Sequence, residues 1–167
     1  MAKLSNVQKG LVLRVEQATD NDMLDIIKDI EERGGEFIIE PLISKYFKST
    51  SELIKKQIIS LFCRFKDNSV AEAWLKALQN YIDEPEVFKL LSATWQSSID
   101  FSACINEFLV FIENGDVQTS LEAITGIQEN ISLVENENLE LLKSNLTKLN
   151  LSEPMIQILV SDIIDSI

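Results

Sequence analysis

Carboxylates are the most frequent chemically active side chains in this sequence, whereas histidine is absent. The 167 residues include 27 Asp and Glu against 15 Lys and Arg, which gives a formal net charge of −12. Without histidine, neither a Ser-His or Cys-His nucleophile pair nor a His-liganded metal site can form. Carboxylate, lysine, tyrosine and cysteine chemistry remains, but no spacing singles out a catalytic group. We therefore expect a non-enzymatic protein with no catalytic residue, no cofactor and no metal site.

The carboxylates are concentrated in the second part of the chain. Residues 1–66 contain 11 Lys and Arg and 10 Asp and Glu, a net charge of +1, whereas residues 67–167 contain 4 and 17, a net charge of −13, and the two sum to −12. No basic residue lies between Lys89 and Lys143. The carboxylates in that interval, none of which has calcium-loop spacing, are Asp100, Glu107, Glu113, Asp116, Glu122, Glu129, Glu135, Glu137 and Glu140.

This charge distribution bears on the kind of partner that the protein could bind. Phosphate backbones bind through Lys and Arg contacts that release counterions, so the acidic half argues against direct nucleic-acid binding. It would instead attract a basic protein and raise its association rate. We therefore expect a protein-protein interaction module or scaffold with an acidic contact surface. The candidate contact residues are Glu107, Glu113, Asp116, Glu122 and Glu129.

Two alternatives to this interpretation stay open at the level of sequence. An acidic surface can simply keep a helical protein soluble. The protein could also be an inhibitor or immunity-type protein whose acidic surface mimics nucleic acid and blocks a basic nuclease or toxin. Composition and spacing do not decide between these functions.

The remaining composition predicts a cytoplasmic protein without membrane contact. No stretch approaches the roughly 18 uninterrupted apolar residues of a membrane span, and the start, Met1–Asn6, lacks the long apolar segment of a secretory signal. The only two cysteines, Cys63 and Cys104, lie in apolar segments with helical periodicity. They are expected to be small buried hydrophobic residues without a disulfide.

Apolar residues recur at intervals of three and four along nearly the whole chain, which predicts helices and no strands. From Phe37 onward a pair of helices recurs about every 33 residues, a period typical of stacked helical repeats. A single pair cannot bury both of its apolar stripes, so we expect one all-α domain of stacked antiparallel helix pairs, about ten helices in all. The predicted units are an N-terminal capping pair in residues 1–35 and repeats in residues 36–66, 67–98, 99–132 and 133–167.

Several local signals mark the predicted helix ends. Gly34-Gly35 is expected to end a helix in the left-handed conformation. Ser49–Glu52 and Ser69–Glu72 match the capping box. Pro41 is expected near the first turn of its helix. In the third repeat, a helical stripe from Phe101 to Ile112 should precede a turn at 114–116.

The third unit resembles the HEAT repeat. Its residues Phe108–Val117 run from an apolar helix into an Asp-containing turn, and Leu121–Ile124 begin a second helix. The resemblance implies an armadillo-type α-solenoid, a right-handed superhelix whose concave face is built from the second helices and is used for binding. The tetratricopeptide repeat is the competing interpretation, because Trp74 and Tyr81 have its spacing, but its small-residue and closing-proline positions do not recur.

Three further features each have a structural and a functional interpretation. The cations Lys55, Lys56, Arg64 and Lys66 form either a basic strip or a solvated helix face. Trp95 either lines a pocket or packs between repeats with its indole N–H bonded to a local acceptor, and Asp100 is expected to cap the following helix. The apolar final helix, from Ile156 to Ile164, either packs inward on both sides or forms a dimer contact.

Overall fold

The computed structural model describes residues 4–167, and every regular element in this part of the chain is a helix. This confirms the predicted all-α class and the expected number of helices. The expectation about the N-terminal signal rests partly on residues 1–3, which lie outside the described residues. The α-helices are α1 (Asn6–Gln17), α2 (Asp20–Arg33), α3 (Glu36–Lys48), α4 (Glu52–Arg64), α5 (Ala71–Gln79), α6 (Val87–Gln96), α7 (Leu109–Asn114), α8 (Val117–Asn130), α9 (Asn136–Leu146) and α10 (Pro154–Ser166).

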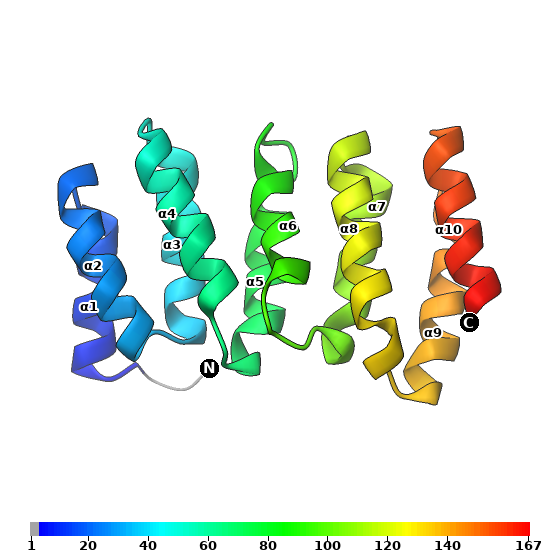
Figure 1. Cartoon of the computed structure of the whole chain (residues 1–167), viewed down its shortest axis with the longest axis horizontal. Coiled ribbons are helices and arrows are strands. Elements are labelled where there is room, and N and C mark those ends of the chain that lie inside the picture. Colours follow the sequence, from blue (N-terminus) through cyan, green and yellow to red (C-terminus); the bar gives the residue numbers. More distant parts are fainter. Residues whose placement is uncertain (1–3) are drawn as a thin grey trace.

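The helices stand in two layers, with the even-numbered helices in front and the odd-numbered ones behind (Figure 1). In the front layer α2 packs on α4, α4 on α6, α6 on α8 and α8 on α10; in the back layer α1 packs on α3 and α3 on α5. Two α-helices fall in each of the five predicted units. Three short 3-10 helices complete the described chain: η1 (Asn68–Val70), η2 (Ser102–Phe108) and η3 (Ile131–Leu133).

Polar side chains join successive helices of the front layer. Arg64 of α4 bonds to Glu31 of α2, 33 residues earlier, and Lys55 of α4 bonds to Glu86 at the start of α6, 31 residues later. Trp95 of α6 donates a hydrogen bond of 2.8 Å to Glu122 of α8, 27 residues later. Each link spans about one repeat of sequence. These contacts therefore fix the lateral register of neighbouring pairs.

Asparagine side chains satisfy backbone groups in the turns between pairs. The Asn68 side-chain oxygen accepts the N–H of Asp100 at 3.0 Å. The Asn130 side-chain oxygen accepts the N–H of Phe101 at 2.9 Å, and its amide nitrogen donates to the Gly126 carbonyl at 2.9 Å. Because a buried backbone N–H without a partner is costly, these residues stabilise the turn between α6 and η2.

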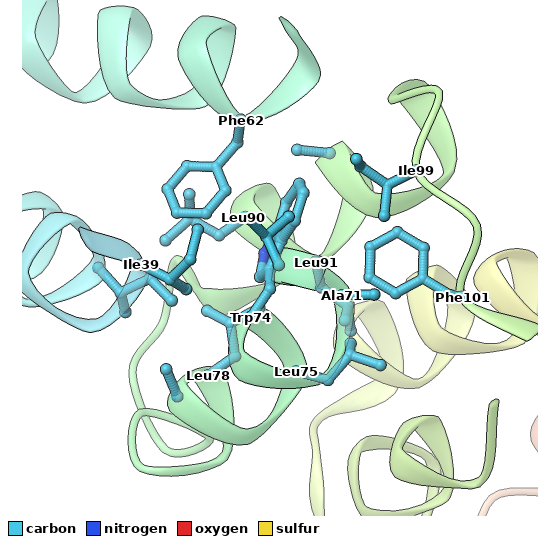
Figure 2. Packing of buried hydrophobic residues seen from close by; sticks show 14 of the residues in the cluster. Ile39, Phe62, Ala71, Trp74, Leu75, Leu78, Leu90, Leu91, Ile99 and Phe101 are labelled. Carbon is cyan, nitrogen blue, oxygen red and sulfur yellow. The ribbon is translucent and has the colours of Figure 1, made fainter. Parts of the chain in front are cut away.

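A chain of aromatic rings runs through the middle of the core. It begins at Phe65 and Phe62, continues to Trp74, and passes through Phe101 to Phe108, with successive ring centroids 5.7, 4.4, 5.6 and 5.8 Å apart. Figure 2 shows Trp74 between Phe62 and Phe101, among aliphatic side chains. All of these rings except Phe65 are completely buried. The predicted repeats thus share one continuous core.

Some predicted helix caps are wrong in detail. Ser51, not Ser49, is the N-cap of α4, where its hydroxyl accepts the N–H of Ile54. The buried hydroxyl of Ser49 instead donates to the Asp20 carboxylate, a long-range contact that local sequence does not reveal. At the second predicted box, Asp67 caps η1 and α5 has no side-chain cap.

The predicted left-handed glycine cap after α2 is also wrong. Gly34 has φ −70° and Gly35 has φ −176°, and none of the described residues has a positive φ. Glycine is needed at position 34 for space, because a Cβ there would lie 2.5 Å from the carbonyl oxygen of Ile30. The sequence signal for a helix end is therefore right, but its physical cause is close backbone approach.

Two further helices depart from expectation. The predicted stripe from Phe101 to Ile112 is not one α-helix, because its first part is the 3-10 helix η2 and the backbone at Cys104 has φ −120° and ψ 24°. This kink lets both Ile105 and Phe108 reach the core. In α3, Pro41 is the sixth residue and therefore lies beyond the first turn, where it removes one helical N–H donor.

Candidate functional site

The five predicted contact carboxylates are spread over both layers. Glu107 lies in η2 and Glu113 in α7, on the back layer. Asp116 lies in the turn that follows α7, and Glu122 and Glu129 lie in α8, on the front layer. The five residues therefore occupy one repeat but do not form a single face.

Both back-layer carboxylates bond to neighbouring repeats. Glu107 is partly buried and accepts a hydrogen bond of 2.8 Å from the side-chain amide of Gln79 in α5. Glu113 is exposed but accepts the backbone N–H of Asn150, in the turn before α10, at 3.1 Å. Their charges thus contribute to the stacking of successive pairs as well as to the surface.

Two of the other three carboxylates also have structural partners. Asp116 is the N-cap of α8 and accepts the N–H of Thr119 at 2.7 Å. Glu122 accepts the indole N–H of Trp95 at 2.8 Å. Of the two interpretations of Trp95, this contact favours the one in which it joins neighbouring repeats, although the acceptor is distant in sequence and 36% of the residue is exposed. The sequence indicated a partner for Trp95, but only the packing of α6 on α8 reveals which one.

Glu129 is the one candidate that is exposed and has no hydrogen bond within the described chain. It lies near the end of α8, where the chain passes through η3 into α9 (Figure 1). Three further exposed carboxylates follow at this connection, Glu135, Glu137 and Glu140. We call these four residues the acidic corner. Sequence reasoning recorded all four charges but named only Glu129 as a contact residue.

The ion pairs of the described chain all involve residues between Arg14 and Lys89. Residues 99–167 contain 12 Asp and Glu against 2 Lys, a net charge of −10, and form no ion pair with described residues. The carboxylates of the last two units are therefore not neutralised by cations of the part of the chain that the structure describes. Their repulsion destabilises the fold slightly and creates a negative potential around these units.

Two of the four cations that were considered as a possible basic strip form ion pairs within the structure. Lys55 bonds to Glu86, and Arg64 bonds to Glu31. The Lys55 and Lys89 ammonium groups beside Glu86 hold the pKa of that carboxyl below its usual range. Only Lys56 and Lys66 of the strip are exposed without an ion pair in the described chain. This pattern favours the interpretation of a solvated helix face that stabilises the layer.

The two cysteines are half-buried and unpaired. Neither side chain is fully buried, which differs from the expectation. Burial raises the pKa of the Cys104 thiol to about 12 and also raises the pKa of Cys63. Since the thiolate is the nucleophile, neither group is activated for covalent catalysis at neutral pH.

This leads to a prediction about thiol reactivity. At pH 8 both cysteines should react with iodoacetamide more slowly than a cysteine in a short peptide, Cys104 by well over about tenfold, because their thiols stay protonated. After unfolding in guanidinium chloride both should react at the peptide rate. Mass spectrometry of time points would measure this. Rapid alkylation of the folded protein at either position would contradict the pKa directions.

A groove of about 490 Å³ lies between α1 and α3 on the back layer. Apolar side chains including Val12, Phe37 and Tyr81 line it, together with Glu40 and Lys48. The sequence did not indicate this groove, because its walls come from α1, α3 and Tyr81 in the turn after α5. None of the five candidate contact carboxylates lines it.

The described residues contain no group of three or more Cys, Asp or Glu side chains arranged to hold a metal ion. No described helix is long and apolar enough to cross a membrane.

Comparisons with family models, curated proteins and solved structures all ended without a match. The resemblance to HEAT repeats therefore stays a prediction from the sequence, whereas the stacking of helix pairs is observed in the structure. Function has to be argued from the surface itself.

Proposed function

We propose that this protein is a non-enzymatic binding module whose last two units attract a basic protein partner. The observation that carries the proposal is the separation of charge. All ion pairs of the described chain lie at or before Lys89, whereas residues 99–167 hold a net charge of −10 without one. A basic partner would supply the missing counter-charges.

The negative potential would mainly raise the rate at which a basic partner associates and the selectivity for that partner. A negative potential over two units steers a cationic surface into contact and raises its association rate, most strongly at low ionic strength. It also repels nucleic-acid phosphates and other acidic proteins. The stacked pairs supply a broad surface on which several carboxylates can act together.

The test uses a variant in which the acidic corner is neutralised, with Glu129, Glu135, Glu137 and Glu140 all changed to Gln. These four are chosen because they are exposed and have no side-chain hydrogen bond in the described chain. The probe is a labelled deca-lysine peptide, and binding to the full chain is measured at 20 and 150 mM NaCl. We expect the variant to bind at least about tenfold more weakly at the lower salt concentration, because four attractive charges are lost.

The matched control removes four carboxylates from the other half. Glu16, Glu32, Glu36 and Glu40 are exposed and form no ion pair in the described chain, so changing them to Gln gives the same net charge. We expect less than about a twofold loss of affinity for this control. Equal losses in both variants would show that only the net charge matters and would contradict the proposal.

A further measurement separates the inhibitor function from a general binding module. Duplex DNA itself should bind neither the wild-type chain nor the acidic-corner variant. If the wild-type chain, but not the acidic-corner variant, blocked DNA cleavage by a basic nuclease at stoichiometric concentration, the inhibitor function would be favoured. A scaffold would leave the rate of cleavage unchanged.

A further inference from the structure

Trp95 and Glu122 form an exposed aromatic-carboxylate pair on the front layer. The Trp95 indole donates its Nε1–H to Glu122 Oε2 at 2.8 Å, while 36% of the residue is exposed to solvent. The other tryptophan, Trp74, is completely buried in the core. Trp95 therefore presents aromatic surface that the core does not use.

The Glu122 carboxylate has capacity for a second partner. Its Oε2 atom accepts the indole N–H, but its Oε1 atom receives no hydrogen bond within the described chain. The residue also forms no ion pair there, and no cation occurs in the sequence between Lys89 and Lys143. A partly buried carboxylate in this setting attracts an external cation.

The neighbouring residues place this pair on an accessible surface. On α6, Ser92 lies three residues before Trp95, on the same side of the helix, and is partly exposed. On α8, Thr125 lies three residues after Glu122, and Glu129 lies four residues after Thr125. Thr125 is partly exposed and Glu129 is exposed. Because α6 packs directly on α8 and Trp95 bonds to Glu122, Trp95 lies beside this row of α8 residues.

We propose that Trp95 and Glu122 bind an arginine side chain of the basic partner. This proposal rests on the proposed function and names the partner's chemistry. A guanidinium group is planar, so it can stack on the indole face while donating to Glu122 Oε1. A lysine ammonium makes the ion pair but does not stack in this way. The hydrogen bond to Glu122 orients the indole before the ligand arrives, which lowers the cost of binding.

The test measures binding of two peptides, acetyl-Gly-Arg-Gly-Arg-Gly-amide and the same peptide with lysines, to the full chain. Calorimetry gives the affinities, and tryptophan fluorescence reports on Trp95 because Trp74 is buried. We expect tighter binding of the arginine peptide. Trp95→Leu and Glu122→Gln should each weaken it about three- to tenfold. Gln at position 122 keeps an acceptor for the indole N–H, so the local structure is preserved.

Glu32→Gln is the matched control, since it removes one exposed carboxylate of the front layer, on α2, that has no ion pair in the described chain and lies outside the last two units. It should weaken binding of the arginine peptide less than about twofold. Equal effects of Glu122→Gln and Glu32→Gln with no effect of Trp95→Leu would overturn the site. So would equal affinities for the two peptides, or failure of the arginine peptide to bind while deca-lysine still binds at the acidic corner. In each of these cases the proposed basic partner would stand.

Discussion

Replacing Trp74 by alanine should lower the free energy of unfolding by about 3–5 kcal/mol. Trp74 is fully buried, and its ring lies 4.4 Å from the Phe62 ring and 5.6 Å from the Phe101 ring, measured between centroids. The substitution would leave a large cavity at the junction of α4, α5 and η2 (Figure 2). Chemical denaturation followed by circular dichroism would measure the loss.

A second substitution at the same position separates volume from polarity. The Trp74 Nε1–H has no hydrogen-bond partner within the described chain. Trp74→Phe removes this buried donor as well as part of the ring, so its cost should be less than about half that of Trp74→Ala. Trp95→Ala, where the residue is 36% exposed, should cost less than Trp74→Ala. A loss below about 1 kcal/mol for Trp74→Ala would contradict the central role of this ring.

The second large effect is expected at Gly126. In an ordinary helix, Gly→Ala stabilises by about 1 kcal/mol. At Gly126 in α8, however, a Cβ atom would lie 2.5 Å from Cε1 and 2.8 Å from Cζ of Phe108, a fully buried ring. We therefore expect Gly126→Ala to destabilise the protein by about 1–3 kcal/mol, because the ring has to shift within a packed core.

Gly10 provides the matched control for this prediction. It also lies inside a helix, α1, but a Cβ there would meet no described atom within 4 Å. Gly10→Ala should therefore stabilise the protein by about 0.5–1 kcal/mol. Adding Phe108→Leu to Gly126→Ala should cost less than the sum of the two single changes, because the smaller side chain relieves the contact. Stabilisation by Gly126→Ala would show that α8 and η2 are not packed as described.

Helix positions were largely predictable, and helix ends only in part. Thr19 caps α2 together with Asp22, which lies three residues later. Ser49 was assigned to a cap by its spacing from Glu52, but it bonds to Asp20 from 29 residues away. The capping pattern is a local rule, so it cannot tell which of several nearby hydroxyls has a better partner in another repeat.

On the candidate surface, too, the sequence does not reveal contacts between residues of different repeats. The sequence identified where negative charge accumulates, including Glu122 and Glu129. It did not show that Glu122 bonds to Trp95 or that Glu129 has no hydrogen bond in the described chain. As a result, charge reversal at Glu122 would disturb an inter-helix contact, whereas the same change at Glu129 would alter only the surface.

The amino-acid sequence by itself determined the helical class, the paired repeat and the separation of charge. These follow from spacing over three or four residues and from sums over segments, which need no knowledge of distant contacts. Only the tertiary structure decided the kink at Cys104, the space required at Gly126 and the pairing of Trp95 with Glu122. The physical reason is that the latter contacts join residues of different helices, whose mutual distance is set by the packing of whole helices and not by local periodicity.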